Sequence, residues 1–167
     1  MNILTEILPS AVELGGRNYR IRTDFRTWIY VSRILSATGS AALAAAVCYI
    51  DIPPDPSLAA EGVEFFFTRG EKSEKGEEAL FSFDLDADYI YCAFLSQYGI
   101  DLNSTKLHWW KFISLFKGLT AEHTLSKIME IRGADLSRVS DREARGRLMR
   151  LKRKYAIKKC GDLSAAF

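Results

Sequence analysis

The sequence predicts a mainly α-helical protein: a helical bundle-like domain with an N-terminal β-hairpin. Apolar residues recur at three- and four-residue spacing along most of the chain, between glycine, proline or capping residues. Only one short stretch alternates apolar and polar residues as a strand does. The chain has 167 residues, 48% of them hydrophobic and 26% charged, which suits a domain that buries a core without disulfides. We expect a single domain over residues 1–160 and a disordered tail at 161–167.

The alternating stretch lies near the N-terminus, at residues 11–22. Apolar residues alternate with polar ones on both sides of Gly15 and Gly16. Glycine tolerates the positive φ angles that a tight hairpin turn needs. Because an isolated hairpin is only marginally stable in water, we expect helices to pack against this one.

Three helices are expected in the first half of the chain. Thr23 and Asp24 are placed to cap a helix with one buried face, and this helix breaks around Gly39. A second, alanine-rich helix runs from 41 to about 49. Prolines then keep the chain extended, because proline forces the residue before it out of the helical region. Ser57 is expected to cap a third helix, which continues through Phe67.

An acidic, mobile loop is expected at about residues 69–79, where charged residues and glycine replace the helical pattern. Two aromatic helices follow, at about 84–98 and 105–117, and a glycine stands after each. We expect these two helices to pack against each other, with Trp110 at the centre of the core.

Two more helices complete the expected fold. Thr120 is placed to cap the first, which stops near residue 133. Ser140 and Glu143 have the spacing of a capping box, in which the serine oxygen accepts the N–H of Glu143 and the glutamate reaches back. The last helix should therefore begin there and run to about residue 157.

Charge is unevenly distributed, although the net charge is only +2. Residues 51–101 hold twelve acids and three bases, whereas 141–159 hold nine bases and two acids. A cationic amphipathic helix can bind an acidic protein surface, nucleic acid or an anionic membrane. The alternative is a solvated face on a helix that packs through its narrow apolar stripe. That stripe consists of Ala144, Leu148, Leu151 and Tyr155.

We assign partner binding to five cations of this last helix. Its stripe has no Trp or Phe, which argues against a membrane, and no nucleic-acid reading module is recognisable, which makes nucleic acid the weaker alternative. The expected target is an acidic protein surface, on a partner or at residues 61–88 of the chain itself. The five residues are Arg142, Arg145, Arg150, Arg153 and Lys154.

Patterns that mark an enzyme or a metal site are missing from the sequence. It contains no nucleophile elbow, phosphate loop or G-x-G-x-x-G motif. Neither His108 nor His123 has a partner at ligand spacing. The D-x-D-x-D run at 84–88 suggests calcium, but Tyr89 and Leu95 stand where an EF-hand needs Gly and Glu. We therefore expect no catalytic residue, no cofactor and no metal.

The three cysteines are far apart in the sequence, which argues against a disulfide framework and for a reducing compartment. Cys48 and Cys92 lie in apolar stretches and are expected to be core residues. The first ten residues lack the basic flank and long apolar region of a signal peptide. The longest weakly polar run, at 41–50, is too short to span a membrane.

Six short motifs in a fixed order carry a resemblance to a known family. Together with the hairpin, they resemble the gene-product-fifteen family of tailed bacteriophages and Gram-positive prophages. The resemblance covers about residues 1–35 and 84–157 and is weak over the acidic middle. The motifs are TDFR at 23–26, DADYIYCAFLSQYGIDL at 86–102, LHWWKF at 107–112, GL at 118–119, IMEIR at 128–132 and LKRKYA at 151–156.

The resemblance implies a tail assembly chaperone of the host cytoplasm. It implies that the protein binds the long, helical tape-measure protein, keeps it soluble and helps to recruit the major tail protein. The family has no catalytic residues to carry over. Two alternatives stay open: a structural tail completion or connector component of the virion, and a nucleic-acid-binding regulator that uses the basic helix. A homo-oligomer is open as well.

Overall fold

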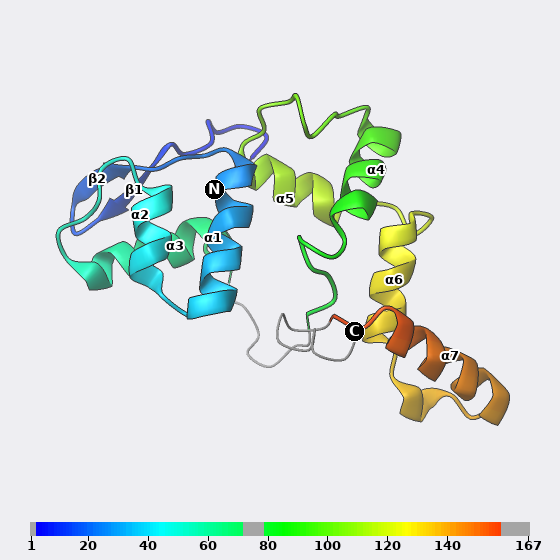
Figure 1. Ribbon diagram of the computed structural model, residues 1–167. Helices are drawn as coiled ribbons and strands as arrows, with labels where there is room; N and C mark the ends of the chain where they lie inside the picture. Colours follow the sequence, from blue (N-terminus) through cyan, green and yellow to red (C-terminus); the bar gives the residue numbers. More distant parts are fainter. Residues whose placement is uncertain (1–2, 72–78, 158–167) are drawn as a thin grey trace, which may run out of the picture. The chain divides into compact units, whose positions relative to one another are not determined.

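The computed structural model describes residues 3–71 and 79–157 (Figure 1). Within these residues the chain forms seven α-helices, one short 3-10 helix and one antiparallel β-hairpin, so the mainly α-helical prediction is confirmed. Most of the expected acidic loop and the whole expected tail at 161–167 lie outside the described residues.

The chain folds into two compact units. One unit comprises residues 1–75 and 102–117, and the other comprises residues 76–101 and 118–167. The single domain over residues 1–160 stays a prediction.

The hairpin of the first unit consists of β1 (Ala11–Leu14) and β2 (Arg17–Arg20), with Val12 opposite Tyr19. Both turn glycines, Gly15 and Gly16, have positive φ angles of 56° and 75°, as the sequence predicts. The buried side chains of β1 pack on a helix at Gly62, where an added Cβ would collide with Tyr49 and lie 2.9 Å from Leu14. Glycine at this position lets the hairpin approach the helix.

Three helices follow the hairpin: α1 (Phe25–Thr38), α2 (Ala41–Cys48) and α3 (Pro56–Thr68). Asp24 caps α1 by accepting the backbone N–H of Arg26, as expected. The expected cap of α3 is wrong by two residues. Asp55 caps this helix and accepts the N–H of Ser57 at 2.8 Å, because Pro56 can take the first helical position, where no N–H is needed.

The core of the first unit is aromatic and is completed by α5 (Trp109–Lys117). The Trp28 ring stacks on Phe66 at 4.7 Å between ring centroids, and Trp109 stacks on Phe112 at 5.7 Å. Trp110, the residue expected at the centre of a core, is 4% exposed. In Figure 1, α5 lies beside α1, and the contacts confirm this packing.

The second unit contains α4 (Ala87–Tyr98), α6 (Thr124–Gly133), the 3-10 helix η1 (Leu136–Arg138) and α7 (Arg142–Lys154). Helix α6 packs on both α4 and α7. The sequence suggested that the two aromatic helices are mutual partners. In the structure α4 and α5 belong to different units, and each packs mainly on a helix of its own unit.

The two described cysteines differ in their surroundings. Cys48 is buried, and burial raises the pKa of its thiol to about 12. Cys92 is exposed, so its expected place in a core is wrong. The buried face of α4 carries Ile90 and Phe94. Cys92 lies midway between them along the helix and therefore on the opposite face.

Candidate partner-binding surface

Helix α7 is capped by Asp141, not by the predicted capping box of Ser140 and Glu143. The Asp141 carboxylate accepts the backbone N–H of Ala144 at 2.7 Å. The expected reach-back of Glu143 is replaced by an ion pair with Arg147 at 2.8 Å. Aspartate is as good an N-cap as serine, and its charge also suits the positive end of the helix.

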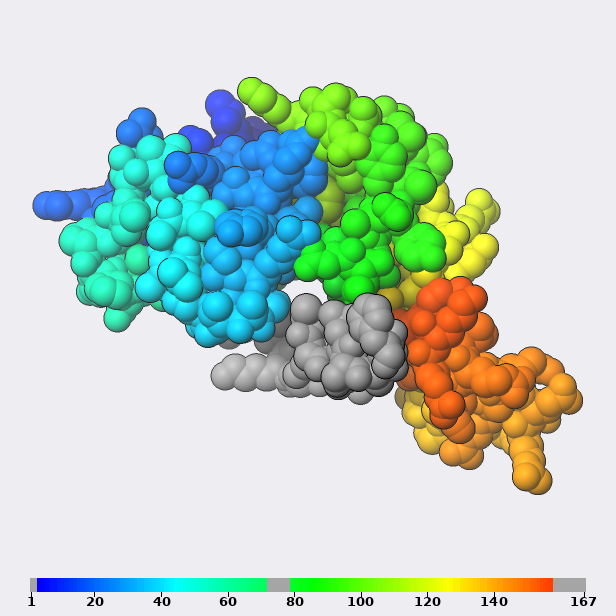
Figure 2. Space-filling model, in the orientation of Figure 1, coloured from blue at the N-terminus to red at the C-terminus, as the bar shows by residue number. Residues whose placement is uncertain are grey.

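Helix α7 packs on the rest of its unit through a stripe that is only partly covered. Ala144, Leu148 and Tyr155 are half-buried, whereas Leu151, the fourth predicted stripe residue, is 39% exposed. Met149 is 48% exposed, and no residue of α7 is buried. In Figure 2 the atoms of α7, orange to red, lie at the surface. Most of the helix circumference is therefore available to a partner.

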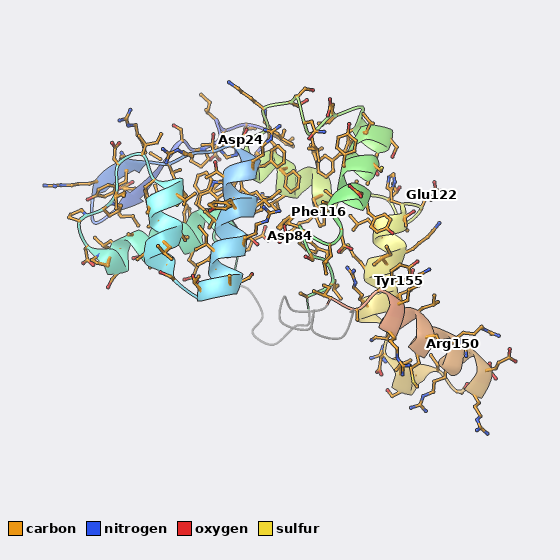
Figure 3. All side chains as sticks on the ribbon, viewed as in Figure 1. Asp24, Asp84, Phe116, Glu122, Arg150 and Tyr155 are labelled. Atoms are coloured by element: carbon orange, nitrogen blue, oxygen red, sulfur yellow. The ribbon has the colours of Figure 1, made fainter. Side chains whose placement is uncertain are left out.

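The five predicted partner-binding residues are all exposed and share one side of α7. At about 100° per residue they fall within roughly half of the circumference, opposite the half-buried stripe. Arg145 and Lys154 lie at the two edges of this arc. Arg142, Arg150 and Arg153 lie between them. Figure 3 shows Arg150 on this helix, among side chains that end in nitrogen.

The side chains of the four arginines in this set have no partner among the residues that the structure describes. The guanidinium groups of Arg142, Arg145, Arg150 and Arg153 make no hydrogen bond or ion pair there. Lys154 lies over the Tyr155 ring, with its Nζ 5.2 Å from the centroid. Because like charges on one helix repel by a few tenths of a kcal/mol per close pair, an acidic partner would relieve an unfavourable arrangement.

Gly146 stands at the middle of the cationic side of α7. An added Cβ at this position would meet no other part of the described chain within 4 Å. Glycine inside a helix costs about 1 kcal/mol relative to alanine. Nothing in the described chain therefore requires glycine here.

Arg132, which forms a buried ion pair with Asp86, also holds the C-terminal end of α7. Arg132 of α6 makes two hydrogen bonds to the Asp86 carboxylate, at 2.6 and 3.0 Å, and the two side chains are 9% and 2% exposed. The same guanidinium donates its Nε–H to the carbonyl of Tyr155 at 2.6 Å and an Nη1–H to the carbonyl of Leu80 at 3.0 Å. The Asp86 carboxylate also accepts the N–H of Ser82 at 2.9 Å.

Lys152 makes a second attachment between α7 and its unit. Its ammonium donates to the carbonyl of Ala134, just after α6, at 2.7 Å. Together with Arg132, it fixes the half-buried side of the helix. The five predicted residues take no part in this attachment and are left for a partner.

Sequence reasoning missed the Asp86–Arg132 pair. Asp86 stands in the D-x-D-x-D run at 84–88, which gives no sign of a partner elsewhere in the chain. Its backbone does cap α4, but its side chain makes no capping hydrogen bond. A usable signal was present in IMEIR, where an arginine follows the apolar positions Ile128 and Met129 in the last turn of a packed helix. Such an arginine needs a carboxylate partner when it is buried.

The two histidines have structural surroundings. His108 Nδ1 accepts the backbone N–H of Trp110, and its Nε2 lies 3.0 Å from the carbonyl of Pro9. His123, not the predicted Thr120, is the cap residue of α6, and its Nε2 lies 2.7 Å from Oε1 of Gln97. Within residues 3–71 and 79–157, His, Cys, Asp and Glu form no group of three or more that could hold a metal ion.

No described helix is both long enough and apolar enough to cross a membrane.

Residues of the TDFR and LHWWKF motifs assemble the first unit. The backbone N–H of Trp109 donates to the carbonyl of Thr23 at 2.7 Å, and the Phe25 ring stacks on Phe112 at 4.8 Å. Arg26 donates to the carbonyls of Leu102, Asn103 and Thr105. The residues of these motifs make contacts within the first unit. Helix α7 is therefore the better candidate for binding a partner.

Comparison with known families gives a match to the family described as Bacteriophage Gp15 protein, over residues 61–157. The match covers more than half of the chain. The chain belongs to this family. The resemblance to it is thereby confirmed, although residues 1–35 lie outside the matched range. No curated protein and no solved structure matches the chain.

The range that matches the Bacteriophage Gp15 protein family begins in α3 and ends just after α7. It therefore contains Asp86, Arg132 and all five candidate partner-binding residues. The surface of α7 is part of the region by which this bacteriophage protein is assigned to its family.

Proposed function

We propose that this bacteriophage protein is a tail assembly chaperone. In this proposal it acts without catalysis, in the host cytoplasm, and binds the tape-measure protein, the major tail protein or both during tail morphogenesis. Membership of the Bacteriophage Gp15 protein family supports a role in phage biology. The tail proteins as partners come from the resemblance of the sequence motifs.

The observation that carries the proposal is the cationic side of α7. Its arginines are exposed and have no partner among the described residues, whereas the opposite side of the helix is attached through Lys152 and Arg132. A surface of this kind speeds association with an oppositely charged protein and selects against other partners.

Co-expression with the tape-measure protein and the major tail protein of the same phage tests this function. We expect the tagged chain to recover at least one of them. Reversal of Arg145, Arg150 and Arg153 to Glu should reduce recovery, most strongly at low salt, where electrostatic steering is least screened. The matched control reverses Arg17, Lys106 and Lys127 to Glu, three exposed cations elsewhere that change the charge equally.

Recovery that is equal for both triple variants at every salt concentration would show that the cationic side of α7 is merely solvated.

Mass spectrometry of purified virions tests the structural alternative, because a chaperone should be missing from mature particles whereas a connector should be present. The unpartnered cations also favour nucleic acid as a second target. A salt-dependent shift of duplex DNA that the α7 reversal removes would support that function instead.

A further inference from the structure

We propose that the side of α7 centred on Gly146 binds an acidic helical segment of a partner protein, and that Gly146 is the point of closest approach. This inference rests on the proposed function, because it specifies the chemistry of the partner at the same surface. The proposed function names tail proteins as partners but no acidic helical segment. Neither it nor the family match gives a role to Gly146.

The charge of the surface selects an acidic partner. The arc around Gly146 carries arginines on both sides and one acid, Glu143, which is paired with Arg147 at 2.8 Å. The guanidinium group matches a carboxylate through two parallel hydrogen bonds. Arg142 and Arg150 have no such carboxylate among the described residues, so their donors are open to a partner.

Because Gly146 has no side chain, a partner helix can lie close to α7 at this position. No described neighbour requires glycine at this position. Arg142 lies four residues before it, and Met149 and Arg150 lie three and four residues after it, so their side chains surround the glycine on the helix surface. The result is a shallow notch with cations at its rim. A small residue at the contact lets a second helix lie nearer, because interaxial distance depends on the side chains at the crossing.

The spacing of the arginines fits a helix better than an extended chain. Arg142 and Arg150 are eight residues apart, which is about 12 Å along the helix axis. A partner helix with two acids eight residues apart presents its carboxylates at the same interval and on one face. Its intervening turn then lies over Gly146. In an extended strand every second side chain lies on one face, so its acids would follow one another at a different interval along the axis.

The apolar side chain beside Gly146 favours a protein over nucleic acid. Met149 is 48% exposed and adjoins the notch, so the surface has an apolar centre with a charged rim. That is the anatomy of a protein interface, and methionine adapts well to a partner helix. A phosphate backbone would gain nothing from Met149.

A synthetic helical peptide with Glu and Leu along one face is the probe for this inference. Its dissociation constant from the full chain is measured by fluorescence anisotropy, and thermal unfolding is followed by circular dichroism. We expect Gly146→Ala to melt no lower than wild type, since its Cβ meets no described neighbour. The same variant should bind the peptide about tenfold more weakly, because a methyl group is forced into the contact.

Three controls accompany the Gly146→Ala variant. Arg142→Glu with Arg150→Glu should abolish peptide binding, whereas Lys127→Glu, at an exposed position of α6, should leave it unchanged. A peptide with Gln in place of every Glu should not bind. A duplex DNA of matched charge should bind no more tightly than the acidic peptide.

Several results would overturn the inference. It fails if the acidic peptide does not bind, if Gly146→Ala binds it as wild type does, or if the Gln peptide binds equally. Tighter binding to DNA would replace the acidic helix by nucleic acid. The proposed function fails separately, if neither tail protein is recovered in co-expression while the peptide series behaves as expected. If a tail protein is recovered equally by wild type and Gly146→Ala, the function survives and the inference falls.

Discussion

Arg132 concentrates more of the second unit's polar contacts than any predicted site residue. Its guanidinium connects the segment before α4, the N-cap of α4 and the end of α7 through hydrogen bonds to Leu80, Asp86 and Tyr155. A buried ion pair adds little net stability over apolar residues of the same volume, but removal of one partner leaves an unpaired buried charge. Arg132 is therefore a structural residue whose loss also releases the last turn of α7.

Replacement of Arg132 by Ala should lower the free energy of unfolding by about 3–5 kcal/mol, because the Asp86 carboxylate stays buried and unpaired. Chemical denaturation of the full chain measures this change. Arg147→Ala is the control, since its ion pair with Glu143 is exposed and contributes about 0–1 kcal/mol. The double variant Asp86→Ala with Arg132→Ala should lose less than the sum of the single losses. Additive losses would show that the pair does not act as a unit.

His108 gives the first unit a dependence on pH. Burial lowers the pKa of His108 below the usual value for histidine, about 6.5, and the charge of Lys111 lowers it further, although the hydrogen bond to the carbonyl of Pro9 raises it. The neutral ring also serves the structure, because its Nδ1 accepts the N–H of Trp110 at 3.0 Å. Protonation of Nδ1 would remove that acceptor.

The free energy of unfolding should therefore fall as the pH decreases below about 6.5. In this window the unfolded chain, with the higher His pKa, binds more protons than the folded chain, so acid favours unfolding. Denaturation at a series of pH values between 7 and 5 measures the effect. His108→Gln, which does not titrate, serves as the reference, and its stability difference from wild type should shrink toward pH 5. A constant difference would contradict the role given to His108.

At the scale of elements, α5 closes the end of α3. The indole N–H groups of Trp109 and Trp110 donate to the carbonyls of Phe67 and Phe66, at 3.0 and 2.9 Å. These carbonyls lie in the last turn of α3, where no further helical N–H is available to them. The two adjacent tryptophans thus combine core packing with capping of a neighbouring helix.

Trp110→Ala should destabilise the protein by about 3–5 kcal/mol, because it removes a buried aromatic ring and leaves a cavity. Thermal unfolding and chemical denaturation measure the loss. Trp110→Phe separates the two contributions, since it retains an aromatic ring but leaves the carbonyl of Phe66 without its donor, at a cost of about 1–3 kcal/mol. An unfolding curve of Trp110→Ala identical to wild type would refute the central position of this residue.

Helix α7 contrasts with α5 because no residue of it is buried. Its fold depends on the half-buried stripe and on Lys152 and Arg132, so its outer side is free to change. The triple reversal of Arg145, Arg150 and Arg153 to Glu should alter the free energy of unfolding by about 1 kcal/mol or less, as surface substitutions do. Circular dichroism and denaturation check this. Loss of helical signal would mean that these arginines have structural roles.

At the scale of the whole molecule, the chain passes between its two units more than once. It leaves the first unit at about residue 76, returns at 102 and leaves again at 118. The first unit therefore depends on α5, which follows α4 in sequence, and neither unit is a continuous segment. A single truncation cannot separate them without removal of part of a core.

Hydrogen exchange should distinguish two folding units from one. Trp110→Ala should raise amide exchange mainly in residues of the first unit, and Arg132→Ala mainly in residues of the second, because each residue lies in the core of its own unit. Mass spectrometry of peptic fragments resolves the two sets. Equal loss of protection in both units, for both variants, would instead support the single cooperative domain expected from the sequence.

Much of the secondary structure was predictable because its signals are local. The hairpin around Gly15 and the C-terminal glycines of α1 and α4 were recognised from residues a few positions apart. The errors are local as well: the caps of α3, α6 and α7 were each displaced by one to three residues. At α3 and α7, Ser and Asp residues near the helix start compete for the cap, and the chain before the helix decides between them. At α6, the cap residue His123 makes no side-chain capping hydrogen bond, so no local pattern marks it.

By itself, the sequence determined the helices, the hairpin and a last helix with cations on one side, because spacing along a helix places residues on a face. Only the tertiary structure decided that Asp86 and Arg132, 46 residues apart, share a buried contact. Only it placed the two aromatic helices in different units and showed that an added Cβ at Gly146 would meet no other described element. The physical reason is that burial and pairing depend on segments brought together by folding, and no local pattern specifies which segments those are.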